Sequence, residues 1–216
     1  MKIDIEVPQG LEDVTLHQYQ RFLKIQESTE DENVLATKMI EIFCNVSPEI
    51  VKGLKVNDAY AIVEILKAMM TEKTDLQRVI RVRGIRYGFI PNLDEMSFGE
   101  YVDLDTYLTS WDNMHKAMSV LYRPIEAQDK DLYNIKEYEA KIDDNLLHMP
   151  MDAVMGSILF FYHLGNDLSQ TMINYLTEKQ EHQLVQYINS ELDGDGTPVY
   201  MGYLKGILDN LKISLN

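Results

Sequence analysis

The hydrophobic pattern of this chain switches from a helical to an alternating period in one central stretch, and that switch constrains the fold more than any other feature. Over residues 79–90 apolar side chains recur at every second position, with Gly84 near the middle of the stretch. Alternation of this kind is typical of β-strands, and a central glycine marks the turn between two of them. The sequence therefore predicts a β-hairpin at residues 79–90, ended by Pro91 and Asn92.

Both flanks of the hairpin have the three- and four-residue spacing of helices, each preceded by a capping signal. The expected starts are Thr15, the acidic region 29–32, Ser47 before Pro48, Asn57 or Asp58, Ser97 with Glu100, Asp103 or Asp105, and Pro150. Gly53 is expected to end the third helix, and Pro124 to end a helix that runs through residues 107–122. Further helices are expected at residues 178–189 and 199–215, separated by a loop at residues 193–198.

Two short segments complete the predicted architecture. Ile3, Ile5 and Val7 alternate with charged residues and predict an N-terminal strand, whereas residues 126–131 are polar and predict a connector. The expected fold class is mainly α, a multi-helix, bundle-like domain with one β-hairpin and a short N-terminal strand. The expected regions, which together form one compact unit, are a strand plus helical cluster at 1–75, the hairpin at 76–96 and a helical region at 97–216.

Composition excludes several classes of protein. Of the 216 residues 45% are hydrophobic, enough for a core, and 35 acidic against 20 basic residues give a net charge of −15. That charge opposes tight binding to nucleic acid, which depends on clustered lysine and arginine. The longest apolar run, residues 153–161, is far below the roughly 20 residues of a membrane span. The single cysteine, Cys44, excludes an internal disulfide and is expected to be a buried, inert thiol.

Known catalytic and metal-binding motifs are missing from the sequence. Its five histidines, at positions 17, 115, 148, 163 and 182, do not have the spacing of metal ligands. The segment from Asp193 to Gly196 is similar to the start of a calcium loop, but the twelfth position from Asp193 is Leu204, which offers no side-chain oxygen. We therefore predict no catalytic residues, no cofactor and no metal, and expect that the chain is not an enzyme.

Contact with other proteins is the remaining function that the residues favour. Four arginines lie within nine positions of the expected hairpin, where they would face an acidic protein surface or phosphate, or simply solvent. Trp111 belongs to a helical stripe that is typical of a core and, less often, of an interface. Arg123 either anchors a helix end or contacts a partner. The candidate interface residues are Arg78, Arg81, Arg83, Arg86, Trp111 and Arg123.

Four blocks of sequence carry a resemblance to a known family. They are GIRYGFIPNL at 84–93, SFGEYVDLD at 97–105, WDNMHKAMSVLYRPI at 111–125 and HMPMDAVMGSILFFYHLGNDL at 148–168. Together they resemble a family of small acidic structural and assembly proteins of tailed bacteriophages, including the crAss-like group. The flanking segments TLHQY at 15–19 and IFCNVSP at 42–48 resemble the family more loosely.

The resemblance implies a non-enzymatic protein of the virion, located in the portal and neck region of the head-tail connector or inside the capsid. It implies oligomeric assembly with other phage structural proteins, first in the cytoplasm of the bacterial host and then in the virion. No catalytic residue and no cofactor carries over. Two alternatives remain: a tail-assembly chaperone that is absent from the mature virion, and an enzyme of host takeover or DNA handling.

Overall fold

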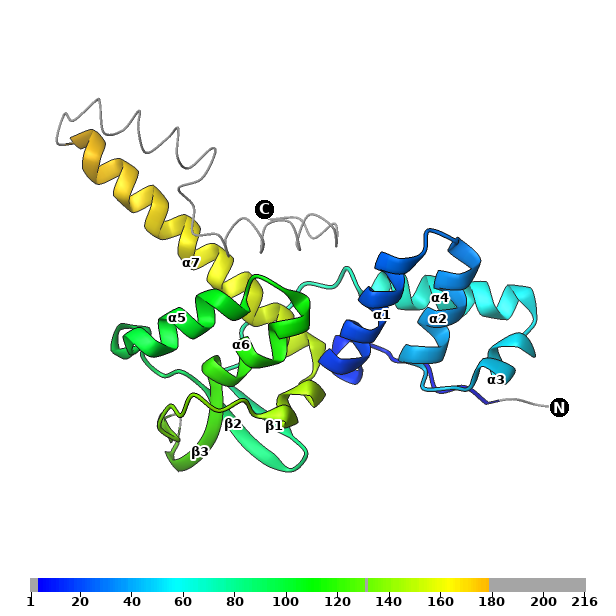
Figure 1. Ribbon diagram of the computed structural model, residues 1–216, viewed down its shortest axis with the longest axis horizontal. Coiled ribbons are helices and arrows are strands. Elements are labelled where there is room, and N and C mark those ends of the chain that lie inside the picture. The colour runs from blue at the N-terminus through cyan, green and yellow to red at the C-terminus, as the bar shows by residue number, and fades with distance from the viewer. Residues whose placement is uncertain (1–3, 131, 179–216) are drawn as a thin grey trace.

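The computed structural model describes residues 4–130 and 132–178, in which seven α-helices accompany a four-stranded antiparallel sheet (Figure 1). The expected helices at 178–189 and 199–215, and the loop between them, lie outside the described residues, apart from Glu178 at the end of α7. The first half of the chain forms a short 3-10 helix and four α-helices: η1 (Leu11–Asp13), α1 (Leu16–Ser28), α2 (Glu32–Phe43), α3 (Pro48–Lys52) and α4 (Val56–Met69).

Local capping determines where these N-terminal helices begin. Thr15 and Gln18 form a capping box at the start of α1, because each side chain bonds the other residue's backbone N–H. Asp31 accepts hydrogen bonds from the backbone N–H groups of Asn33 and Val34 at the start of α2. α3 begins with a proline and is followed by Gly53. The predicted starts of these three helices are confirmed, and α4 begins within two residues of its expected start.

The sheet is a meander of four strands in the order β1-β2-β3-β4. The strands are β1 (Val79–Val82), β2 (Ile85–Phe89), β3 (Tyr122–Asp129) and β4 (Leu132–Ile135). Arg83 and Gly84 both have positive φ, 49° and 84°, which is the geometry of a type I′ turn. This turn matches the twist of the two strands it joins, so the predicted hairpin at residues 79–90 is confirmed.

The expected fold class, a mainly α bundle with one hairpin, is wrong, because the chain has a mixed α/β fold with a second hairpin. Residues 126–129, expected as part of a polar connector, continue β3 and pair with β4. These residues are exposed on both faces, and the register shifts between Ile125 and Ala127. An exposed strand end with a bulge has no apolar alternation, so its sequence looks like a loop.

The expected N-terminal strand is also not formed, since the described residues 4–7 belong to no strand. Ile5 and Val7 are partly buried against the core, whereas Asp4 and Glu6 are exposed. An extended segment lying on a core buries alternate side chains just as a strand does. Alternation alone therefore did not distinguish this segment from a strand with a pairing partner.

The second half of the chain adds three α-helices and three 3-10 helices to the sheet. They are η2 (Leu93–Glu95), α5 (Phe98–Tyr107), η3 (Trp111–Asn113), α6 (Met114–Leu121), η4 (Asp144–His148) and α7 (Met151–Glu178). Ser97 and Glu100 form the predicted capping box of α5. The continuous helix expected through residues 107–122 is instead divided, because Ser110 accepts a hydrogen bond from the N–H of Asp112 and begins η3.

Helix α7 connects the two halves of the molecule (Figure 1). The chain entering α7 is tied to the chain entering α1 by two backbone bonds, from Leu16 N to Met149 O at 2.9 Å and from Met151 N to Val14 O at 2.8 Å. Further along, the Tyr122 hydroxyl donates to Gln77 O at 2.7 Å and lies 3.0 Å from Ser157 Oγ. These bonds fix α7 against both β3 and the segment that leads into β1.

Gly156 permits the close approach of α7 to that segment. A Cβ atom added at Gly156 would lie 2.2 Å from the carbonyl oxygen of Asp75, and backbone cannot move aside as a flexible side chain can. Gly99 in α5 offers a contrast, since its nearest neighbour would be Ser97 Oγ at 4.0 Å. One helical glycine is therefore required by packing, and the other is not.

We predict that Gly156→Ala lowers the free energy of unfolding by about 1 to 3 kcal/mol, because the added methyl group pushes α7 away from residue 75. Gly99→Ala is the matched control and should leave stability unchanged or raise it by up to about 1 kcal/mol. Urea unfolding followed by circular dichroism measures both. Equal effects of the two substitutions would show that the close approach at Gly156 does not hold α7 in place.

Candidate protein-binding surfaces

Four exposed arginines lie along the first hairpin: Arg78 directly before β1, Arg81 in β1, Arg83 in the turn and Arg86 in β2. We call these four residues the arginine hairpin. Arg81 and Arg86 are directly opposite each other in the register of β1 and β2. Arg86 also donates a hydrogen bond to the side-chain oxygen of Gln128 on β3. None of the ion pairs found within residues 4–130 and 132–178 includes any of the four. Like charges placed opposite each other disfavour the isolated strand pair, and no described carboxylate offsets them.

The register of β1 and β2 shows which face of the sheet carries Arg81 and Arg86. Ile80 and Tyr87 form a cross-strand pair on the buried face of the sheet, so the neighbouring pair of Arg81 and Arg86 lies on the opposite face. At the tip, Arg83 occupies the turn close to η4 and α1. Burial lowers the pKa of His148 in η4, and the positive charges of Arg83 and His17 lower it further. Arg83, His17 and His148, which come from three separate segments, therefore lie close together at the tip.

Arg123, another predicted interface residue, forms a buried ion pair with Glu100. Its Nη2 lies 2.8 Å from Glu100 Oε1, and the two side chains are 14% and 7% exposed. Glu100 also accepts a hydrogen bond from the N–H of Ser97 at 2.7 Å. The ring centre of Tyr138 lies 5.8 Å from the guanidinium carbon. Arg123 thus anchors the first turn of α5 to β3, and its contact with a partner stays a prediction.

Trp111 lies in η3, partly buried against the core. Its ring centre is 4.8 Å from that of Tyr19, and its carbonyl accepts a hydrogen bond from Gln20 Nε2 at 2.6 Å. Met114 and Met118, which follow Trp111 at helical spacing, are completely buried. The stripe therefore packs η3 and α6 onto the core, while an interface role for the exposed part of Trp111 stays a prediction.

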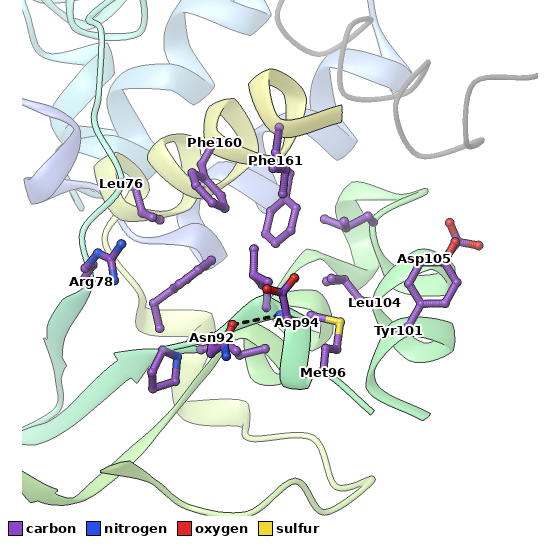
Figure 2. A pocket seen from close by; sticks show the side chains of 16 residues that line it. Leu76, Arg78, Asn92, Asp94, Met96, Tyr101, Leu104, Asp105, Phe160 and Phe161 are labelled. Atoms are coloured by element: carbon purple, nitrogen blue, oxygen red, sulfur yellow. Dashed lines mark hydrogen bonds between the residues drawn. The ribbon is translucent and has the colours of Figure 1, made fainter. Parts of the chain in front are cut away.

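A half-open cavity of about 490 Å³ lies between α5 and α7, and we call it the α5–α7 groove (Figure 2). Aromatic rings form one wall: Phe160 and Phe161 of α7 have ring centres 5.6 and 6.1 Å from that of Phe89 at the end of β2. The facing wall comes from Leu93 of η2, Met96 directly after η2 and Leu104 of α5. The polar lining residues are Arg78, Asn92, Asp94 and Asp105.

The sequence did not reveal this groove. Phe160 and Phe161 end the apolar run at residues 153–161, and the structure places both at the groove wall, with Phe161 only 7% exposed. The lining residues come from positions 76 to 164, brought together by the fold alone. One local signal was available: Phe98, Tyr101 and Val102 share one face of α5 and are 81%, 49% and 42% exposed.

The titratable groups of the described residues form no recognisable catalytic set. Burial raises the pKa of Cys44 to about 11, which keeps this thiol protonated and unreactive near pH 7. Burial also lowers the pKa of His115, whose Nδ1 has no hydrogen-bond partner. Residues 4–130 and 132–178 contain no group of three or more side chains able to hold a metal ion. In the same residues no helix is long and apolar enough to cross a membrane.

Comparison with protein-family models, curated proteins and solved structures found no match to this chain. The resemblance to the phage family therefore stays a prediction. The arguments about function below start from the two surfaces just described, the arginine hairpin and the α5–α7 groove.

We predict that Arg123→Ala lowers the free energy of unfolding by about 3 to 5 kcal/mol, because it leaves the buried Glu100 carboxylate without its counter-charge. Arg123→Ala combined with Glu100→Gln should recover part of that loss, since the uncompensated charge is gone. Lys67→Ala is the control: its pair with Glu64 is 61% and 72% exposed, and its loss should change stability by at most about 0.5 kcal/mol. Chemical unfolding measures all three, and a small effect of Arg123→Ala would contradict the anchoring role.

Proposed function

We propose that this chain is a non-enzymatic structural protein of a tailed bacteriophage virion, located in the head-tail connector or inside the capsid. It acts by binding other phage structural proteins within an oligomeric assembly. The observation that supports this proposal most directly is the arginine hairpin, an exposed basic element on a chain with a net charge of −15. The sequence resemblance supplies the phage context.

The arginine hairpin suits an acidic protein surface. Guanidinium groups bind carboxylates through two parallel hydrogen bonds, and a partner carboxylate between Arg81 and Arg86 would relieve the repulsion of that pair. Nucleic acid is a weaker candidate, because a long polyanion would also meet the acidic remainder of the surface. The type I′ turn holds the tip in one conformation, which reduces the entropy lost on binding.

We predict that Arg81→Glu combined with Arg83→Glu strongly reduces incorporation into particles while the monomer stays folded. The carboxylate introduced at position 81 would face Arg86, so the unfolding free energy should stay level or rise by about 0.2 to 1 kcal/mol. Lys55→Glu combined with Lys73→Glu is the matched control, because it makes the same charge change at exposed residues of other segments. Quantitative mass spectrometry of purified particles measures incorporation.

Normal incorporation of the arginine variant would count against the arginine hairpin as the binding element. Arg81→Lys combined with Arg83→Lys refines the result, since it keeps the charge but removes the paired hydrogen bonds and should have an intermediate effect.

A tail-assembly chaperone is the second candidate, and the α5–α7 groove is the observation that favours it. A chaperone must cover apolar segments of its client, and the groove offers an apolar, aromatic wall for that purpose. The same mass spectrometry separates the two functions: a virion protein is present in mature particles, and a chaperone is absent from them.

A further inference from the structure

We infer that the α5–α7 groove binds an amphipathic α-helix of another protein, one that has lysine or arginine toward its N-terminal end. This inference rests on the shape, lining and charge of the groove, and it holds whether or not the chain belongs to a phage. The ligand is a helical protein segment. The groove would be a second docking element, which shares only Arg78 with the arginine hairpin.

The groove has the form that helix recognition requires. It lies between two helices and has a volume of about 490 Å³, enough to take several apolar side chains (Figure 2). Its walls combine rings from α7 and β2 with aliphatic side chains from η2 and α5. An amphipathic helix fills such a space with side chains at positions i, i+3, i+4 and i+7.

The apolar surface extends beyond the groove onto α5. Tyr101 belongs to both, because it lines the groove and is 49% exposed beside Phe98 and Val102. Phe98, with 81% exposure, is the most exposed large apolar side chain found in the described residues. Side chains at i, i+3 and i+4 lie on one helical face, so these three form a continuous strip that a helix in the groove would cover.

Charge identifies the kind of helix. Asp94 and Asp105 line the groove at η2 and α5, and Glu95 follows Asp94, so this side is acidic. Arg78 lies on the opposite side of the groove, at the entrance to β1 (Figure 2). A bound helix with basic residues toward its N-terminus, where its dipole is also positive, complements the acidic side. Its C-terminal end would then lie toward Arg78.

The same charges argue against a second copy of this chain as the occupant. A two-fold contact through this surface would bring Asp94, Glu95 and Asp105 of one copy toward the same residues of the other. Repulsion between those carboxylates would oppose self-association.

The test uses the full chain and two fluorescent probe helices of about 18 residues, each with leucine along one side. The first probe has lysine in its N-terminal half and glutamate in its C-terminal half, and the second has the halves exchanged. We expect fluorescence anisotropy to give a Kd on the order of 10 µM for the first probe and binding about tenfold weaker for the second. Hydrogen exchange with the first probe bound should show new protection in η2 and α5.

Two pairs of variants locate the contact. Tyr101→Ala should weaken the first probe about tenfold, whereas Tyr60→Ala, which removes a 57% exposed ring from α4, should leave its binding unchanged. Asp94→Lys combined with Asp105→Lys should abolish the preference for the first probe. Glu27→Lys combined with Glu30→Lys makes the same charge change at exposed residues far along the chain and should preserve it.

Three results would overturn the inference: no saturable binding of either probe, equal binding of both probes, or binding that the groove variants retain. Sedimentation of the full chain completes the test. A dimer that Tyr101→Ala dissociates would assign the groove to a second copy of the chain and would also overturn the proposed occupant.

Discussion

The contact of α7 with residues 75–77 holds the other elements of the structure in place. At Gly156 the helix meets the backbone of Asp75, and at the next residue along α7 Tyr122 joins Ser157 to the carbonyl of Gln77. Because Tyr122 is the first residue of β3, the same contact positions the sheet. Phe160 and Phe161 follow one turn later on α7. The closeness of α7 to residues 75–77 therefore determines the position of these two rings in the wall of the α5–α7 groove.

Local signals predicted local structure well. The helix start at Thr15, the capping box at Ser97, the stop after α3 and the turn at Gly84 depend on residues within about four positions of one another, and sequence displays such relations directly. The second hairpin was missed because the outer half of β3 is held by backbone pairing in solvent, without an apolar face. Backbone pairing leaves no pattern in the side chains.

The same difference between local and long-range relations explains which candidate site could be predicted from the sequence. The arginine hairpin was visible because its residues are adjacent in sequence. The groove was not, since its lining spans nearly ninety positions and exists only once α5, η2 and α7 are packed. Arg123 and Trp111 are residue types that are common at interfaces, and both were predicted as interface residues. In the structure each makes an internal contact with a residue far away in sequence, Arg123 with Glu100 and Trp111 with Tyr19. Sequence indicated the type of residue but not its surroundings.

Tyr133 links strands that are not neighbours in the sheet. It belongs to β4, at one edge of the sheet, yet its hydroxyl donates to the carbonyls of Phe89 on β2 and of Arg78 next to β1, at 2.7 and 3.1 Å. Its ring crosses the sheet over Gly88, where an added Cβ atom would meet it closer than any real contact allows. The two edges of the sheet are thereby fastened together. Separating the first hairpin from the rest of the sheet therefore requires breaking the hydrogen bonds of Tyr133 in addition to the backbone pairing of β2 with β3.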